Sequence, residues 1–457
     1  MDHLRFRLAL AAGKITASFL KLMAGRGTNI PGVIMKKICP DVLARFQMPR
    51  TVICVTGTNG KTGTSNLLTH LLRCGGLDVV NNSEGSNMET GLITALAKRS
   101  DFRGRVEADA AVLEVDERSS PYIYTKITPT YLLCTNLFRD SIKRNGHSEY
   151  IFHKMDDYLP ESTVLLLNGN DPISGLLGQG RNQQIYYAVD RTSESTENCE
   201  NITCDCKVCP QCHRPLKYEY YHYHHIGKPV CSCGFRMPAP AYSAKDVDYA
   251  AGTFTFCEDC QPGLTLPFSG GNLFQVFNTT AAVAMCRLMG MDPQRIRQGV
   301  QEFASIGTRF ADSEMAGHRV VTMLCKNQNP VSSSRSIAYL NHVEGTKDVV
   351  LLITDSKDKV HGSEDISWLY DTDFDALKGE DVHRIFLGGT RCRDLALRLY
   401  LAGVDSEKLA LFPDYGELCT RISGLTAPGS TAVIYYELYA FGIAQQVKQA
   451  LGKEDAK

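Results

Sequence analysis

The segment from Val52 to Leu68, VICVTGTNGKTGTSNLL, constrains the fold of this chain more than any other. Four apolar residues beginning at Val52 predict a buried strand, a turn with two glycines follows, and the leucines after it recur at helical spacing. Backbone N–H groups in a glycine turn and at a helix N-terminus attract negatively charged oxygens. The segment therefore predicts a phosphate-binding loop between a strand and a helix.

Individual residues of this loop have expected roles. The spacing Gly-x-x-Gly-Lys-Thr is shorter than that of the common Walker loop, but it keeps the lysine and the hydroxyl. We expect Lys61 to reach the outer phosphates and Thr62 to hold Mg²⁺. An ordinary glycine turn before a helix is the alternative. The predicted phosphate-binding residues are Gly57, Thr58, Asn59, Gly60, Lys61 and Thr62.

A carboxylate follows a second apolar run, Ala108 to Val115, which predicts another strand with Glu114 near its end. A carboxylate at the C-terminal edge of a parallel strand beside a phosphate loop is well placed for Mg²⁺, so Glu114 is a predicted ligand. A solvated acidic turn is the alternative. Strands are also expected at Tyr131–Cys134 and Val164–Leu167, each followed by a polar turn. This rhythm predicts a doubly wound α/β domain with ligands at its strand ends.

Cysteines crowd into one segment of the chain. Two close pairs of thiols flank a stretch rich in tyrosine and histidine, and thiol pairs joined by a hairpin predict a structural four-cysteine zinc ribbon. Free thiols in a small hairpin are the alternative. The predicted ligands are Cys209, Cys212, Cys231 and Cys233, with substitution by His222, His224 or His225 left open, as is a second metal site at Cys257 and Cys260.

Charge and hydropathy exclude some classes of protein. The formal net charge of −1 gives no electrostatic argument for a nucleic-acid partner. No apolar run reaches the roughly 18 residues that cross a bilayer, so a cytoplasmic location is expected. Near the N-terminus six apolar residues recur at helical spacing, which predicts a helix with an apolar stripe along one face. We expect this stripe to pack on the helix's own domain rather than on a membrane. The six residues are Leu4, Leu8, Ala11, Ile15, Phe19 and Leu22.

The last third of the chain again has an α/β rhythm, which predicts a Rossmann-like domain. Its first strand runs into a long acidic loop that holds the only tryptophan, and we expect this loop to be functional. Strands are predicted at Val349–Ile353, Ile385–Leu387, Ala410–Phe412 and Ala432–Tyr435, with a helix at Arg391–Leu401. The predicted domains are an N-terminal helical segment at 1–49, a central domain at 50–307 with the ribbon inserted at about 199–262, and a C-terminal domain at 308–457.

Several motifs together resemble the Mur ligase family, the ATP-dependent amide-bond-forming enzymes of peptidoglycan synthesis. They are TGTNGKT, Glu114, the TN…RD segment, NGNDP and the terminal α/β domain. The chain is more closely similar to the MurT family, the Mur-ligase-like subunits of lipid II isoglutaminyl synthase. This likeness is carried, from about residue 25 to about residue 400, by RGTNIPG, NNSEGSNM, EVDE, the CPQC…CSCG ribbon, EDISWLYDTDF and GGTRCRDLALRL.

The resemblance implies a glutamine-dependent amidotransferase that uses ATP, Mg²⁺ and Zn²⁺. ATP would phosphorylate the α-carboxylate of D-glutamate in the lipid II stem peptide, and ammonia would convert the acyl phosphate to D-isoglutamine. The ammonia would come from a partner glutaminase subunit (GatD-like). About 50 residues precede Gly57, too few for a nucleotide-sugar domain, which favours a lipid-carried substrate and peripheral contact with the inner membrane face.

The resemblance also implies roles for single residues. Asn278 matches the family's adenine-side asparagine, Asp171 lies in its nucleotide-side turn, and Arg309 matches its hinge arginine, whereas Gln275 replaces another asparagine of the family pattern. Asp365 matches the aspartate that would complete the catalytic triad begun by the partner's Cys and His. Its alternative role is to cap a helix beginning near Ser367, with Asp371 and Asp373 as the next candidates.

Two rival functions remain open at this point. One is a free-standing Mur-type ligase that adds an amino acid, and the other is a zinc-stabilised adaptor that binds a nucleotide without using it. Both keep the phosphate loop, so neither is excluded by that motif alone.

Overall fold

The computed structural model describes residues 2–24, 29–83, 87–139, 147–268, 272–303, 310–315, 318–325, 329–353 and 365–452. The chain divides into two compact units, each of which is treated by itself. The first is built from Met1–Phe138, His147–Glu200 and Asp205–Ala304, and the second from Arg139–Gly146, Asn201–Cys204 and Ser305–Lys457.

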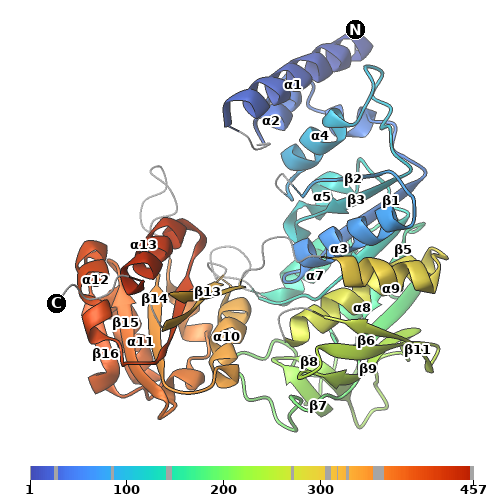
Figure 1. Ribbon diagram of the computed structural model, residues 1–457. Helices are drawn as coiled ribbons and strands as arrows, with labels where there is room; N and C mark the ends of the chain where they lie inside the picture. Colours follow the sequence, from blue (N-terminus) through green and yellow to red (C-terminus); the bar gives the residue numbers. More distant parts are fainter. Residues whose placement is uncertain are drawn as a thin grey trace. The chain divides into compact units, whose positions relative to one another are not determined.

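The first unit is centred on a nine-stranded sheet (Figure 1). Its strands, in spatial order, are β11 (Gln261–Pro267), β10 (Thr253–Glu258), β9 (Tyr242–Asp248), β6 (Gln184–Val189), β5 (Val164–Asn168), β4 (Tyr131–Cys134), β1 (Thr51–Thr56), β3 (Ala110–Glu114) and β2 (Val79–Asn81). From β9 to β2 all neighbours are parallel, and β9, β10 and β11 pair antiparallel. The doubly wound α/β prediction is confirmed, although β9 to β11, expected within the ribbon, belong to this sheet.

Helices cover both faces of this sheet, because alternate residues of a strand point to opposite sides. Cys54 of β1 packs with Leu113 of β3 into a cluster that also holds apolar residues of α4 (Glu89–Lys98), α5 (Ser120–Ile123) and α7 (Ser148–Asp156). Another layer is formed by α3 (Lys61–Cys74), which packs against α8 (Leu273–Leu288) and α9 (Pro293–Glu302), as Figure 1 shows.

Helix α1 (Asp2–Ala24) begins the chain and packs on α2 (Ile30–Ile38) and α4. Its buried residues include Phe6, Ala9 and Leu10, and the Phe6 ring lies 5.8 Å from that of Phe46, just after the 3-10 turn η1 (Val42–Arg45). The helix was predicted correctly, but the prediction that its apolar stripe packs on the domain was wrong. The apolar stripe is exposed apart from the half-buried Ala11, and the opposite face makes the contacts.

Between β6 and β9 the chain makes a separate two-stranded hairpin of β7 (Lys217–Tyr223) and β8 (Ile226–Val230). The two cysteine pairs flank it, one before β7 and one after β8. The remaining short turns of the first unit are η2 (Glu117–Ser119) and η3 (Ser174–Leu176).

The second unit contains a six-stranded sheet in the order β12 (Phe310–Met315), β13 (His318–Leu324), β17 (Thr431–Tyr436), β14 (Lys347–Leu352), β15 (Val382–Gly388) and β16 (Leu409–Phe412). Only the β12–β13 pair is antiparallel. The four strands predicted here are confirmed, with ends shifted by a few residues.

Each face of this second sheet carries its own hydrophobic cluster. Leu351 packs toward α10 (Pro330–Ala338), η5 (Ser367–Asp371) and α11 (Cys392–Leu401), whereas Leu352 packs toward α12 (Tyr415–Arg421) and α13 (Phe441–Leu451). The other 3-10 turns are η4 (Tyr339–His342), η6 (Asp375–Lys378), η7 (Ser406–Lys408), η8 (Ser423–Leu425) and η9 (Leu438–Ala440). Among the helices that the structure describes, none is long and apolar enough to cross a membrane.

Candidate active site

The predicted phosphate loop lies between the end of β1 and the start of α3, as the sequence indicated. Gly57 and Gly60 have φ values of 124° and 87°, in the region that side chains rarely adopt. A Cβ atom on Gly60 would come within 2.4 Å of Asn278 Oδ1, and one on Gly57 within 2.3 Å of Thr135 Oγ1. Glycine is therefore required at both positions by backbone conformation and by close approach of neighbouring side chains.

Asparagine and threonine side chains after β4 fix the conformation of this loop. Asn136 Oδ1 accepts a hydrogen bond from Asn59 N at 3.0 Å, and its Nδ2 donates to Asn59 O at 3.1 Å. Thr135 Oγ1 donates to the same carbonyl at 2.6 Å. From the sequence, the TN pair was recognised only as part of a family pattern, because the contact spans 77 residues.

Lys61 is buried at the first turn of α3 and lies against a carboxylate that the sequence analysis did not select. Its Nζ donates to Glu117 Oε2 at 2.9 Å, and both side chains are almost fully buried. Burial by itself lowers the pKa of Lys61, but the carboxylates of Glu117, Asp116 and Glu114 outweigh it, so the pKa lies above its ordinary value. The lysine is therefore held as a cation at the phosphate loop.

The two predicted magnesium ligands lie next to each other. Thr62 Oγ1 donates to Glu114 Oε1 at 3.2 Å, and Asn87 Nδ2 donates to the same oxygen at 3.4 Å. Asn82 fixes the end of β3 by bonding both the N–H and the carbonyl of Glu114, at 2.8 and 2.9 Å. A hydroxyl and a carboxylate oxygen are hard ligands of the kind that Mg²⁺ takes in proteins, so this pair fits the ion.

Asn278 of α8 lies over the start of α3, where it closes one side of the phosphate loop. Its Oδ1 accepts from Thr64 Oγ1 at 3.2 Å and lies directly over Gly60. Asn278 is therefore part of the same site as the loop, 214 residues away from Thr64 in sequence. Gln275 lies one turn earlier, and its backbone N–H is capped by Asn272 Oδ1 at 3.2 Å.

Asp171 is also close to the loop, but its carboxylate is fully buried. Oδ2 accepts from Leu137 N at 2.8 Å and from Ser174 Oγ at 2.6 Å, and Oδ1 accepts from Ile173 N at 2.8 Å. His225 Nε2 lies 3.3 Å from Oδ1. With its oxygens so engaged, Asp171 braces the turn next to Asn136. The place at the nucleotide that the resemblance implies stays a prediction.

His225 belongs to the tip of the β7–β8 hairpin, so this contact links the cysteine segment to the phosphate loop. Its ring lies 4.3 Å from that of Phe138, and both His225 and Asp171 are inaccessible to solvent. Burial alone would raise the pKa of Asp171, but His225 and the hydrogen bonds from Ser174 and Leu137 outweigh this effect. The pKa of Asp171 therefore lies below its ordinary value. A path of direct contacts therefore runs from His225 through Asp171 and Leu137 to Asn136.

This path predicts that His225→Phe weakens ATP binding without touching the loop. The phenyl ring keeps the packing on Phe138 but removes the polar contact of His225 with Asp171 Oδ1, which still accepts from Ile173 N, so the cost in stability should be about 1 kcal/mol. We expect a lower melting temperature and a higher dissociation constant for ATP by calorimetry. His153→Phe, at an exposed position of α7, is the matched control, and equal ATP affinity in both variants would contradict the proposed link.

The four predicted zinc ligands converge. Their Sγ atoms all lie within 4.8 Å of one another, with Cys209 and Cys233 at 3.6 Å and Cys212 and Cys231 at 3.5 Å. Four thiolates around zinc at ~2.3 Å would have sulfur–sulfur edges of about 3.8 Å, so the cluster fits a tetrahedral ion. Cys257 and Cys260 lie at the β10–β11 turn and join no such group among the described residues.

The histidines named as substitute ligands have other contacts. His222 Nδ1 lies 3.0 Å from Ser195 Oγ, and its Nε2 lies 3.0 Å from Val189 O. His224 and His225 are buried against Phe138. Within the described chain, none of the three joins a group of metal-binding geometry.

Asp365 lies in the second unit, with an exposed side chain. Its Oδ1 accepts from Ser367 N at 2.8 Å, at the start of η5. The N-cap position of η5 is Ile366, so Asp365 lies one residue before the cap that the sequence offered as its alternative role. An exposed carboxylate held in this way is also accessible to a partner chain. Residues 354–364, which precede it, lie outside the described residues, as does Arg309.

A buried arginine of α11 holds the turn that follows Asp365. Arg398 donates to Leu369 O at 2.9 Å and to Thr372 O at 2.8 Å, and its guanidinium lies 5.1 Å from the centre of the Phe374 ring. Burial lowers the pKa of Arg398 below its ordinary value. The tryptophan loop and the RCRDLALRL helix, two separate motifs in the sequence, are therefore parts of one structure.

Asp373, a reserve candidate for the triad, has a structural role instead. Its Oδ2 accepts from Asn201 Nδ2 and its Oδ1 from Ile202 N, both at 2.8 Å. Burial raises its pKa above the ordinary value. Asp371, at the end of η5, is half-buried.

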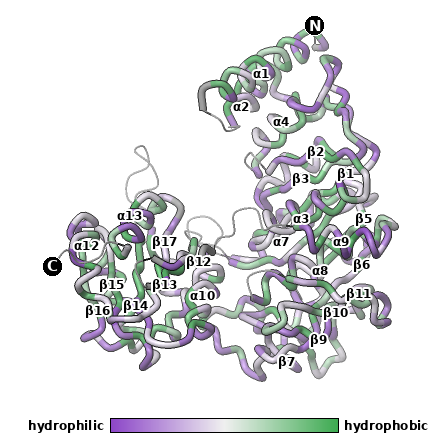
Figure 2. The backbone as a smooth tube through the Cα atoms, in the orientation of Figure 1, coloured by the Kyte–Doolittle hydropathy of each residue, from purple (hydrophilic) through white to green (hydrophobic). Residues whose placement is uncertain are grey.

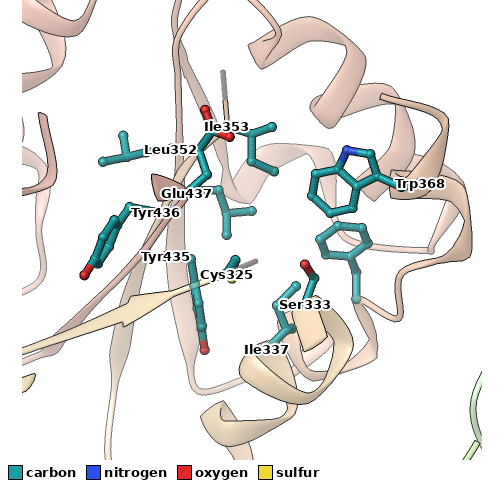
Figure 3. Close-up of a pocket in the computed structure, with 11 residues that line it drawn as sticks. Cys325, Ser333, Ile337, Leu352, Ile353, Trp368, Tyr435, Tyr436 and Glu437 are labelled. Atoms are coloured by element: carbon teal, nitrogen blue, oxygen red, sulfur yellow. The ribbon is translucent and has the colours of Figure 1, made fainter. Parts of the chain in front are cut away.

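A largely apolar pocket lies beside this loop, at the C-terminal ends of β14 and β17 (Figure 3). In Figure 3 Trp368 lies on one side of the pocket, and Tyr435 and Glu437 lie on another. Phe374 also lines the pocket. Ligands of open α/β sheets bind at such strand ends. The position of Trp368 thus connects the Asp365 loop with a cavity in the same unit.

Comparisons with known proteins agree on one family. A family model described as MurT ligase C-terminal matches residues 325–438. The chain is 31% identical over 419 residues to a protein of Streptococcus pneumoniae (strain ATCC BAA-255 / R6), covering 89% of both chains. It is 30% identical over 399 residues to one of Staphylococcus aureus (strain N315), covering 87% of this chain and 88% of the relative. Both are named lipid II isoglutaminyl synthase (glutamine-hydrolyzing) subunit MurT.

Solved structures agree on the fold. A pseudomurein peptide ligase type C from Methanothermus fervidus has a TM-score of 0.66 at 20% identity, covering 92% of this chain and 83% of its own. MurF ligase from Thermotoga maritima in complex with ADP has a TM-score of 0.56 at 17% identity, covering 93% and 84%. At these identities the likenesses show the fold alone.

Proposed function

The chain belongs to the MurT family, the Mur-ligase-like subunits of lipid II isoglutaminyl synthase, and from this premise we propose that it is an ATP-dependent amidating subunit. Its substrate would be the D-glutamate α-carboxylate of the lipid II stem peptide, and its product D-isoglutamine. Mur ligases use ATP and Mg²⁺. The relatives' name specifies a subunit of a glutamine-hydrolysing enzyme, so glutamine would be the source of the ammonia.

The nucleotide site carries this proposal, because Lys61, Thr62 and Glu114 come together at the end of a parallel sheet. Lys61 would neutralise charge on the outer phosphates, and the start of α3 would direct its free N–H groups at them. Mg²⁺, held by Thr62 and Glu114, would neutralise the phosphate oxygens. Asn278 would keep the nucleotide against the loop.

The proposed reaction has two steps. A carboxylate oxygen of D-glutamate attacks the γ-phosphorus of ATP, ADP leaves, and an acyl phosphate forms. The nitrogen of ammonia then attacks the acyl carbon, phosphate leaves with the original oxygen, and the nitrogen loses a proton to give the amide. The site contributes mainly charge neutralisation and positioning to these steps.

Ammonia would be supplied by a glutaminase subunit resembling GatD, and we assign Asp365 to that partner's triad. The support is geometric: Asp365 is exposed, and the turn after it is fixed by Arg398 and by the buried Trp368. A carboxylate placed in this way can orient and stabilise the partner's imidazole.

The experiment that tests the function is amidation of lipid II by the co-purified complex, read as amide formation by mass spectrometry. We expect product with ATP and glutamine, product with ATP and ammonium chloride, and none without ATP. Addition of a free amino acid to the stem peptide would instead support the free-standing ligase. ATP binding with no turnover on any substrate would support the adaptor.

We also propose that Cys209, Cys212, Cys231 and Cys233 hold a structural Zn²⁺ within the predicted ribbon. Four cysteine ligands leave no open coordination position, so the ion would stabilise the hairpin rather than take part in the reaction. The domain boundaries near residues 49 and 307 are proposed on the same family likeness.

Metal analysis of the purified chain should give one zinc per chain. Cys209→Ser should lose most of it, because three thiolates bind zinc more weakly than four, and the hairpin should become sensitive to proteolysis. Cys260→Ser, at an exposed cysteine outside the cluster, is the control and should keep the metal. Equal zinc in the Cys209 variant and the control would rule out the assignment.

A further inference from the structure

The exposed face of α1 has an unusual composition for a water-facing surface. Five large apolar residues there are between 57% (Leu8) and 87% (Leu22) exposed. At 3.6 residues per turn they fall within an arc of about 60° around the helix axis. The α1 stripe, as we name it, consists of Leu4, Leu8, Ile15, Phe19 and Leu22.

The stripe lies opposite the face that holds α1 on the protein. Phe6, Ala9 and Leu10 are buried there, roughly 170° around the axis from the centre of the stripe. The helix is therefore fixed to the first unit by one side and presents an apolar line on the other. Figure 2 shows hydrophobic residues along the length of α1.

Basic residues border the stripe on both sides. At 3.6 residues per turn, Arg5 lies about 40° beyond Phe19 on one side, and Arg7, Lys14 and Lys21 lie about 60°, 80° and 100° beyond Leu4 on the other. Arg5, Arg7 and Lys21 are exposed. Lys14 is half-buried, and its Nζ donates to Ser100 O at 2.5 Å and lies 5.4 Å from the centre of the Phe102 ring, so the docking charge comes from the other three residues. The sequence of the helix contains four such basic residues and only one acidic residue, Asp2.

We propose that α1 docks this chain on an anionic lipid bilayer, lying in the plane of the interface. A helix with an apolar line between basic borders binds such surfaces through both burial and charge attraction. The choice of lipid over a protein partner rests on the basic borders and, in part, on the proposed function, whose substrate is carried by a lipid. Docking would hold the nucleotide-binding unit at the surface where that substrate lies.

The test is co-sedimentation of the full chain, alone and with its co-expressed glutaminase, with vesicles of phosphatidylglycerol and phosphatidylcholine. We expect binding to these vesicles, little binding to phosphatidylcholine alone, and release at high salt. Leu8→Glu/Phe19→Glu should reduce binding at least about tenfold, because it places charge in the apolar line. Arg7→Gln/Lys21→Gln should reduce it about fivefold for each charge removed.

Leu397→Glu is the matched control, because Leu397 is an apolar residue of α11 with 52% exposure outside the stripe. It should bind vesicles like the wild type, and all variants should keep the wild-type melting temperature, since the changed positions are exposed. Failure of the folded wild type to bind anionic vesicles in either form overturns the proposal. A second result would also overturn it: the wild type binds no vesicles, and Leu8→Glu/Phe19→Glu abolishes a dimer of the chain or its binding to the glutaminase. The stripe would then be assigned to a second copy or to that subunit.

Activity separates this proposal from the proposed function. Leu8→Glu/Phe19→Glu should amidate a water-soluble stem peptide at the wild-type rate and lose activity only on vesicle-embedded lipid II. Vesicle binding without any amidation would overturn the proposed function and leave docking intact. Amidation of both substrates at equal rates by a variant that no longer binds vesicles would show that the stripe does not serve this reaction.

Discussion

Lys61→Ala should abolish ATP-dependent amidation, with kcat falling by at least roughly 10²–10³-fold, because the developing phosphate charge loses its buried cation. The same change leaves Glu117 buried without its ion-pair partner, which should destabilise the chain by about 3–5 kcal/mol. Loss of activity in this variant alone would therefore not separate catalysis from folding. The measurement is single-turnover formation of ADP, together with thermal unfolding.

The double variant Lys61→Ala/Glu117→Gln resolves the two effects. It removes both charges of the pair, so most of the lost stability should return while the reaction stays abolished. Lys228→Ala, which breaks an exposed ion pair with Glu219, is the control and should be fully active. Wild-type ADP formation by the stable double variant would show that Lys61 is not at the phosphates.

Asp365→Asn should separate the two sources of ammonia. Glutamine-driven amidation should fall by up to roughly 10⁴-fold, as expected when the aspartate of a triad is replaced by its amide. Amidation driven by ammonium chloride should stay at the wild-type rate, because the nucleotide site is untouched. The asparagine can still accept from Ser367 N–H, so the start of η5 keeps this hydrogen bond.

The chain offers a matched control for this experiment. Asp405 is also exposed and accepts from Glu407 N at 2.9 Å at the start of η7, so both aspartates bond the backbone N–H two residues further on. Asp405→Asn should leave both activities unchanged. Equal loss of glutamine-driven and ammonia-driven amidation in Asp365→Asn would mean that the residue supports the structure of the second unit and takes no part in the partner's chemistry.

Local pattern was sufficient for much of the fold and for part of the site. The predicted phosphate loop is one contiguous motif of seven residues, TGTNGKT. The cysteine pairs have a spacing that few other structures require. The Thr62–Glu114 contact followed from one further rule, that the carboxyl ends of parallel strands meet at one edge. These predictions used information that lies within a strand, a turn or a short motif.

What the sequence did not show depends on contacts between distant segments. Glu117 reaches Lys61 across 56 residues, and Arg398 reaches Leu369 across 29, and neither has a spacing signal. The contact of Asp171 with His225 also has no spacing signal, because His225 comes from an inserted hairpin. The α1 stripe was misassigned for a different reason: helical periodicity finds an apolar face without saying what covers it.

The contact of Asp373 with Asn201 and Ile202 has a consequence for how such a protein can change in evolution. These two residues lie in the middle of the chain, yet they belong to the C-terminal unit and donate to a half-buried carboxylate there. A single recombination near residue 305 would transfer Asp373, the acceptor, without Asn201 and Ile202, its donors. The two units are thus interleaved in sequence, so a single crossover cannot exchange the C-terminal unit with all of its contacts.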